Sequence, residues 1–188
     1  GVSEPSLART GERRIIVELP GVTDPEEAVK ILGRTAQLTF HPVLGLADAT
    51  KPGLIDEDGR DTLELGPATI DGALIEEARA VTGQLGERTI DIEFRGRGPG
   101  AWQDLTGKAA CAPVGDPTRR VAIVLDGKII SSPQVNPDIA CDVGISGGRT
   151  SITGQFTADE AKDLALLVRA GGLPVPVEVI EQRIVGPS

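Results

Sequence analysis

Residues 121–133 read Val-Ala-Ile-Val-Leu-Asp-Gly-Lys-Ile-Ile-Ser-Ser-Pro. Asp126-Gly127 between two β-rich runs predicts a hairpin, because both central residues of a type I′ turn need positive φ. The two-residue turn sets the register, which pairs Leu125 with Lys128, Val124 with Ile129 and Ile123 with Ile130. The first arm is apolar on both faces, so both faces must be covered. The stretch therefore predicts the central hairpin of an α+β domain, with helices packed against it.

Other segments show the patterns of further strands and helices. Apolar alternation predicts strands at residues 13–19, 35–40, 68–71, 88–94 and 150–156, and a long extended segment at 173–185. Apolar spacing and capping signals predict helices at residues 25–32, 72–82 and 101–108, and one from the capping box at 157–160 to Gly171-Gly172. Residues 42–66 are loop-like and acidic, and residues 136–148 are irregular.

The composition excludes several classes of protein. Lys and Arg total 19 against 28 Asp and Glu, and the net charge of −9 opposes nonspecific binding to nucleic acid or anionic lipid. The chain contains three Phe, one Trp and no Tyr, so we expect a core of aliphatic side chains. It contains no Met, which predicts a domain excised from a longer protein or a processed product. No apolar run approaches the roughly 18 residues of a membrane span.

The chemical motifs are weak. Residues 144–148 match G-x-S-x-G around Ser146, but that motif activates a serine only where a helix follows it, and here a strand is predicted. His41 is the only histidine and has no nearby acid pair, which favours a packing or surface role. Residues 56–61 fail the EF-hand spacing, which favours a solvated charged loop. Residues 96–100 lack the G-x-G-x-x-G spacing of a phosphate cradle. We therefore predict no catalytic residue, cofactor or metal; a serine hydrolase acting through Ser146 remains an alternative.

Cys111 and Cys141 are the only cysteines. Extending the hairpin register places Cys111 opposite residue 142, next to Cys141, although intervening prolines interrupt any ladder. Two outcomes stay open at this point: a disulfide in an oxidising compartment, or two buried thiols in the cytosol.

Motifs spread along the chain keep the order and spacing of one family. They are GVSEP at 1–5, RIIVELPG at 14–21, TAQLTF at 35–40, AIVLDGKIISSP at 122–133, ITGQFT at 152–157, EAKDLA at 160–165 and GGLPVPVEVIE at 171–181. Together they resemble the SecD family of accessory membrane subunits of the Sec protein translocase. The resemblance covers nearly the whole chain. It implies most of the first large extracytoplasmic domain, which lies between the first and second transmembrane helices.

The resemblance implies a domain with two parts. Residues 1–41 and 173–188 would form a ferredoxin-like base whose first strand and helix are absent, and residues 42–172 an inserted α+β head. Gly171 and Gly172 are then a possible hinge, or simply a helix C-cap. An extracytoplasmic location also favours a Cys111–Cys141 disulfide. The acidic loop at 45–66 and the cysteine segments match no motif of the family.

The function implied by the resemblance is mechanical and not enzymatic. The domain would transiently bind the unfolded preprotein and move its head against its base, driven by the proton motive force through a membrane part. The implied partners are SecF, the SecY channel complex and the translocating preprotein, at the extracytoplasmic face of the cell membrane. The alternative is a secreted α+β ligand-binding or adhesion module.

Overall fold

The computed structural model describes residues 7–10, 14–17 and 37–171. The chain divides into two compact units, one of Gly1–Thr35 with Pro174–Ser188 and the other of Ala36–Leu173. The predicted helix at 25–32 and the extended segment at 173–185 lie outside the described residues. The ferredoxin-like base, and the boundaries predicted between base and head, therefore stay predictions.

In the smaller unit the structure describes one antiparallel pair of strands, β1 (Leu7–Thr10) and β2 (Arg14–Val17). Leu7 pairs with Val17 and Thr10 with Arg14. The second strand confirms the prediction made for residues 13–19.

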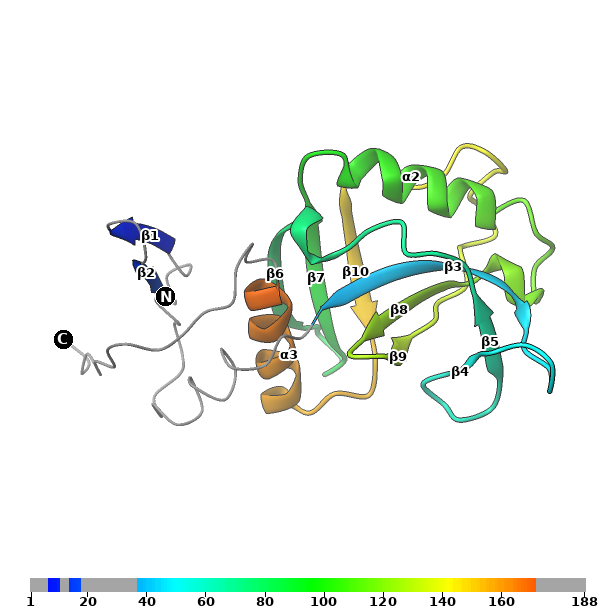
Figure 1. Cartoon of the computed structure of the whole chain (residues 1–188), viewed down its shortest axis with the longest axis horizontal. Coiled ribbons are helices and arrows are strands. Elements are labelled where there is room, and N and C mark those ends of the chain that lie inside the picture. The colour runs from blue at the N-terminus through cyan, green and yellow to red at the C-terminus, as the bar shows by residue number, and fades with distance from the viewer. Residues whose placement is uncertain (1–6, 11–13, 18–36, 172–188) are drawn as a thin grey trace. The chain divides into compact units, whose positions relative to one another are not determined.

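The described residues of the larger unit form two antiparallel sheets (Figure 1). One has five strands in the order β4-β5-β3-β8-β9, and the other has three in the order β10-β7-β6. The strands of the first are β3 (Leu38–Leu46), β4 (Leu54–Ile55), β5 (Thr62–Leu65), β8 (Val121–Leu125) and β9 (Lys128–Ser131). Those of the second are β6 (Ile75–Thr82), β7 (Arg88–Phe94) and β10 (Arg149–Thr153). This mixture of antiparallel sheets and helices agrees with the predicted α+β class.

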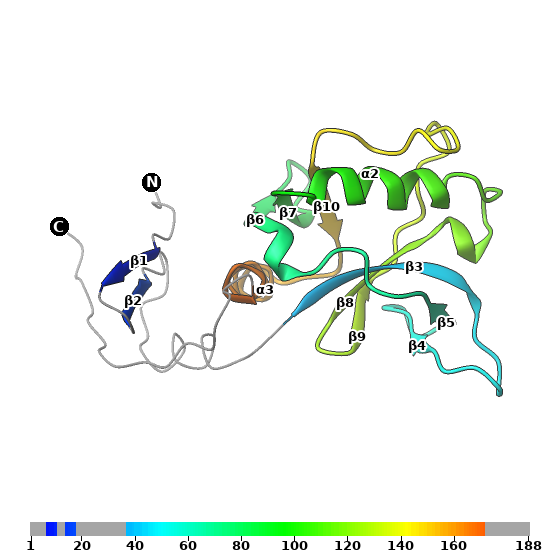
Figure 2. The same cartoon turned by 45° about the horizontal axis from the view of Figure 1, so that its top comes forward.

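In the part of the larger unit that the structure describes, two α-helices and two short 3-10 turns accompany the sheets. Helix α2 (Gly98–Ala109) lies across β3 and β8, and α3 (Ala158–Gly171) packs against β6 and β7 (Figure 2). The 3-10 turns are η1 (Gly72–Leu74) and η2 (Pro117–Arg119). Among the described residues, no helix has the length and hydropathy needed to span a membrane.

The predicted capping box at the start of α3 is present. The backbone N–H of Thr157 donates to Glu160 Oε2 at 2.8 Å, and the backbone N–H of Glu160 donates to Thr157 Oγ1 at 3.2 Å. These reciprocal bonds satisfy two N–H groups that the helix itself leaves unpaired. The expected inward face is buried, and it consists of Ala161, Leu164, Ala165 and Val168.

The β8–β9 hairpin has the predicted turn. Asp126 and Gly127 both have positive φ, 50° and 76°. The pairs Leu125–Lys128 and Val124–Ile129 are as predicted, but the third pair is wrong. Ile123 pairs with Ser131, because a bulge adds one residue to β9 and shifts the register beyond it.

The two apolar faces of β8 belong to two different cores. Val121 and Ile123 lie in the main core, and Ala122 and Val124 lie in a second, smaller one. The second core also contains Val43, Leu63 and Ile129. The prediction that helices cover the hairpin holds for one face only. On the other face the five-stranded sheet curls, so that residues of β4 come within 8 Å of residues of β9, Cα to Cα.

Aromatic side chains occupy the centre of the main core, contrary to the expectation of an aliphatic interior. Phe40, Phe94 and Trp102 are at most 4% exposed. The ring centroids lie 5.4 Å apart for Phe40–Phe94, 5.7 Å for Phe40–Trp102 and 5.6 Å for Phe94–Trp102. Three of the four aromatic residues of the chain therefore meet where β3, β7 and α2 converge.

Three predictions of secondary structure are wrong. The strand predicted at 68–71 is reduced to an isolated bridge between Ile70 and Phe40. Residues 72–82 form η1 and then β6 instead of a helix. A bulge at residue 76 shifts the register of β6. Ile75 and Ala78 therefore pair with the inward residues Phe94 and Ile92. The two apolar residues lie three positions apart, which is the spacing expected of a helix. Residues 42–66 are not a plain loop either, because β3 extends to Leu46 and β4 and β5 follow it.

Candidate functional site

The loop at 136–148 is held on helix α2 by two polar side chains of the helix. The backbone N–H of Ile145 donates to Thr106 Oγ1 at 2.8 Å, and the Thr106 hydroxyl donates back to its own helix. Gln103 Nε2 donates to the carbonyl of Val143 at 3.0 Å. The loop predicted as irregular is therefore fixed in place, although it forms no helix or strand.

One glycine of helix α2 and one glycine of the loop allow the two segments to approach closely. The backbone N–H of Asp142 donates to the carbonyl of Gly107 at 3.0 Å, and a Cβ added to Gly107 would lie only 3.2 Å from the nitrogen of Gly144. Gly144 has φ +70°, and a Cβ there would collide with the carbonyl of Gln103. Packing against α2 thus accounts for Gly144, the first glycine of the G-x-S-x-G match.

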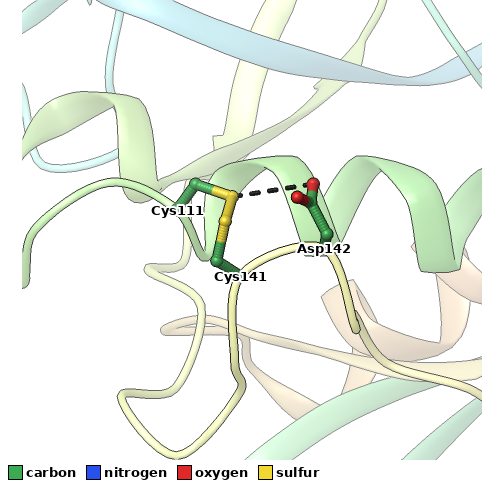
Figure 3. Close-up of side chains that lie close together, drawn as sticks. All are labelled: Cys111, Cys141 and Asp142. Carbon is green, nitrogen blue, oxygen red and sulfur yellow. Dashed lines mark hydrogen bonds between the residues drawn. A yellow bond between two sulfur atoms is a disulfide. The ribbon is translucent and has the colours of Figure 1, made fainter.

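The structure joins Cys111, just after α2, to Cys141, in this loop, by a disulfide (Figure 3). The two Cα atoms are 4.2 Å apart and 30 residues apart in the chain. Both cysteines are exposed, and Cys111 Sγ lies 3.7 Å from Oδ1 of Asp142. The hairpin ladder does not reach Cys111, which follows the helix instead. Oxidation of this pair in the cell stays a prediction.

The structure does not assemble a serine-hydrolase centre around Ser146. The turn leads into strand β10, as predicted, and not into a helix. His41 lies on β3, where its Nδ1 donates to the carbonyl of Gly66 at 2.8 Å. Its Nε2 lies 2.8 Å from Thr39 Oγ1. Both ring nitrogens of the only histidine are therefore engaged within the sheet, which agrees with a packing role.

Arg119 is a buried cation that sequence reasoning missed. Its side chain is 5% exposed, and among the described residues no carboxylate pairs with it. All five donors of the guanidinium face backbone carbonyls: Val135 at 2.9 Å, Ala110 at 2.6 Å, Ala112 at 2.7 Å, Asn136 at 2.9 Å and Ile139 at 3.4 Å. The first turn after α2 supplies two of these carbonyls, so the cation also faces the negative end of the helix dipole.

The acidic turn between β4 and β5 is not simply a solvated loop, and that prediction needs correction. Asp56 is 6% exposed and accepts the backbone N–H of Arg60 at 2.8 Å. The Glu57 carboxylate accepts two hydrogen bonds from Ser132, from its N–H at 2.8 Å and its hydroxyl at 2.7 Å. Nη1 of Arg120 lies 3.6 Å from carboxylate oxygens of Asp56 and Asp61. The turn is thus tied to residues beside β8 and β9.

Ionised Asp56 is stabilised by its surroundings. Burial alone would raise the pKa of Asp56, but backbone N–H groups of Arg60 and Asp61 and the charge of Arg120 outweigh burial and hold the pKa below its ordinary value. A group whose pKa is lower in the folded state stabilises the fold above its unfolded pKa of about 3.9. That contribution is lost as the pH falls through the folded pKa.

We therefore expect Asp56→Asn to lower the free energy of unfolding by about 1–2 kcal/mol at neutral pH, because the amide cannot replace the ionised acceptor. The difference from the wild type should shrink as the pH falls and Asp56 itself becomes protonated. Urea unfolding across pH 7 to pH 2 measures this change. Asp138→Asn is the control, since Asp138 is exposed and, in the described part of the chain, only its backbone N–H takes part in a hydrogen bond. A penalty that does not change with pH would contradict the assignment.

The remaining candidates are packing features or stay untested. Gly98 begins α2, and a Cβ there would lie 2.9 Å from Cβ of Phe94, which supports a packing role for the glycine-rich stretch at 96–100. Within the described ranges the only cluster of three metal-ligating side chains is Cys111, Cys141 and Asp142, whose two sulfur atoms are bonded to each other. Gly171 is the last residue of α3, and Gly172 lies outside the described residues, so the hinge stays a prediction.

Sequence patterns contain only a partial signal for the residues that were missed. Arg119 lies two positions before Val121, so alternation places it on the face of the main core, while Arg120 shares the face of the second core. Nothing local distinguishes Glu57 from its acidic neighbours. Its partner Ser132 lies 75 residues away, and only the tertiary fold brings them together.

Two family models match the chain. The model of the SecDF P1 head subdomain matches residues 52–175. The model of the N-terminal part of the P1 domain of protein translocase subunit SecDF matches residues 1–45. Each covers a different stretch, and the stretch at residues 1–45 ends within strand β3.

Curated relatives match the full length of the chain. Protein translocase subunit SecD of Dictyoglomus turgidum is 39% identical over 188 residues, which are 100% of this chain and 39% of that protein. SecD of Magnetococcus marinus is 35% identical over 206 aligned residues, covering 100% of this chain and 37% of that protein. The chain thus spans about two fifths of the length of these relatives.

Two solved structures are also similar. The crystal structure of SecDF in its super-membrane-facing form has a TM-score of 0.59 and 32% identity, and the match covers 96% of this chain and 25% of that one. A structure described as SecDF, a membrane component that enhances protein export, has a TM-score of 0.58 and 31% identity. Its match covers 98% of this chain and 86% of that one.

Proposed function

The chain belongs to the SecD/SecDF family of protein-translocase subunits, and from this premise we propose that it assists Sec-dependent protein export by transiently binding the unfolded preprotein as it emerges. The single observation that carries the proposal is the family match, which extends over the whole chain. A domain with this task needs a surface that accepts an extended chain of any sequence.

The proposed mechanism is movement of the larger unit against the smaller one. The division of the chain into two compact units supports it, and Gly171-Gly172 lies near the junction at the end of α3. Glycine absorbs large changes of φ and ψ at little cost, so this pair is the proposed hinge. The force would come from the proton motive force through a membrane part, with SecF and the SecY channel complex as partners at the extracytoplasmic face.

Binding fits the described residues better than catalysis does. His41 is occupied by Gly66 and Thr39, and Ser146 lies on a turn that leads into a strand. The alternative of a secreted ligand-binding or adhesion module gains no support from a specific structural feature. The proposal is therefore a non-enzymatic domain of the export machinery.

Crosslinking to a stalled preprotein tests the proposal. The protein to use is a chimera, defined as the SecD of a bacterial host with its matching segment replaced by this chain. A photoreactive amino acid is placed at exposed apolar positions of the larger unit, Ile55 (63% exposed) or Leu85 (95% exposed). We expect crosslinks to a half-exported preprotein, and yields no higher than those from an unrelated extracytoplasmic protein would contradict the proposal.

A further inference from the structure

The five-stranded sheet has an unpaired seam where its two outermost strands face each other. Residues of β4 and β9 approach within 8 Å, Cα to Cα, but no backbone ladder joins the two strands. Strand β4 has only two residues, Leu54 and Ile55, which pair with Leu63 and Thr62 of β5. An edge strand presents a row of N–H and C=O groups that can pair with another extended chain. The seam therefore offers such an edge on β9.

Side chains close the seam where a strand would otherwise pair. Ser132 directly follows β9 and is 4% exposed, and its backbone N–H donates to the carboxylate of Glu57. The Ser132 hydroxyl donates to the second oxygen of the same carboxylate. A carboxylate thus occupies the place that the carbonyl of a neighbouring strand would take. Arg120 adds ion pairs of 3.6 Å to Asp56 and Asp61, so polar contacts at the ends of the two strands accompany the apolar packing of Leu54 on the second core.

The surroundings of the seam suit an unfolded segment. The second core lies inside the curled sheet, and Leu54 is partly buried against it. Ile55 of β4 is an apolar side chain at the seam, and it is 63% exposed. Residues 45–66 carry six Asp or Glu and two Lys or Arg. An extended segment with alternating apolar and basic residues would complement both properties.

We propose that the seam between β4 and β9 is a docking edge for an extended, basic, unfolded polypeptide segment. The segment pairs its backbone with β9 when the contact between Glu57 and Ser132 opens. This inference rests on the proposed function, which supplies an unfolded chain. Backbone hydrogen bonds carry the recognition and tolerate many guest sequences, and the acidic surroundings add the preference for basic side chains.

Two fluorescent decapeptides of alternating Lys and Val test the inference on the full chain. One has an ordinary backbone, and the other is N-methylated at alternate amides, which keeps its side chains and removes its capacity to pair. We expect only the ordinary peptide to bind and to slow hydrogen exchange of residues 128–132. Glu57→Ala should raise its affinity about fivefold, because the competing hydrogen bonds are gone. Asp138→Ala, which removes an exposed carboxylate elsewhere, should leave the affinity unchanged.

Equal binding of the two peptides, protection at another strand, or no binding would each overturn the inference. The crosslinking experiment then distinguishes failure of the seam proposal from failure of the proposed function. If the stalled preprotein still crosslinks to the larger unit of the chimera, the proposed function stands and only the seam is excluded. If crosslinking fails as well, both are excluded.

Discussion

Replacing Arg119 with methionine is expected to lower the free energy of unfolding by about 3–5 kcal/mol. Methionine fills much of the same space but leaves five backbone carbonyls without their donor. Two of them follow the C-terminal end of α2, and the others belong to residues 135–139. Because domains of this size are stable by only about 5–15 kcal/mol, this loss removes a large part of the total. Urea unfolding at neutral pH measures it.

Arg120→Met is the matched control for this prediction. It removes the same kind of side chain from the adjacent position, where the guanidinium is partly exposed and makes only ion pairs of 3.6 Å. We expect it to cost about 1 kcal/mol or less. Arg119→Lys keeps the charge but offers three donors instead of five, so it should recover only part of the loss. Equal effects of the two methionine variants would contradict the role assigned to Arg119.

Removing the disulfide is expected to cost about 3–4 kcal/mol. The link closes 30 residues of chain, and most of its effect comes from restricting the unfolded state. The variant combines Cys111→Ser with Cys141→Ser, and urea unfolding compares it with the oxidised wild type. The loop should stay docked in the variant, because Thr106 and Gln103 hold it independently, so hydrogen exchange at Ile145 should change little.

Chemical reduction supplies the control for the disulfide. Wild-type protein treated with a thiol reductant should match the double serine variant in stability. Alkylation followed by mass measurement of untreated protein reports whether the thiols are free. Two alkylated cysteines, or a double variant as stable as the wild type, would contradict the prediction.

Features with a local cause could be predicted from the sequence. The Asp126-Gly127 turn and the capping box at Thr157 depend on residues within a few positions, and both are present. The helix predicted at 72–82 failed because a bulge in β6 reproduces the apolar spacing of a helix. The prediction of the third pair in the β8–β9 hairpin failed because a bulge in β9 shifts the register. Bulges form where the partner strand dictates them, so local periodicity cannot reveal them.

The polar contacts of the candidate site depend on long-range packing. Glu57 meets Ser132 across 75 residues, and neither has a distinctive neighbourhood in the sequence. Arg119 could be placed on an inward face by alternation, but its five carbonyl partners come from the turn after α2 and from a separate loop. The pairing of Cys111 with Cys141 was favoured through the family resemblance, because the residues alone left two outcomes open.

The central claim is that the chain acts as an export-assisting domain and not as a catalyst. The most direct test is the export rate of a secreted reporter in a SecD-deficient bacterial host that carries the chimera. The same host with the matching segment deleted from SecD sets the baseline. The account predicts that the chimera exports the reporter faster than this baseline. A chimera that accumulates normally in the membrane but exports no faster than the deletion would contradict it.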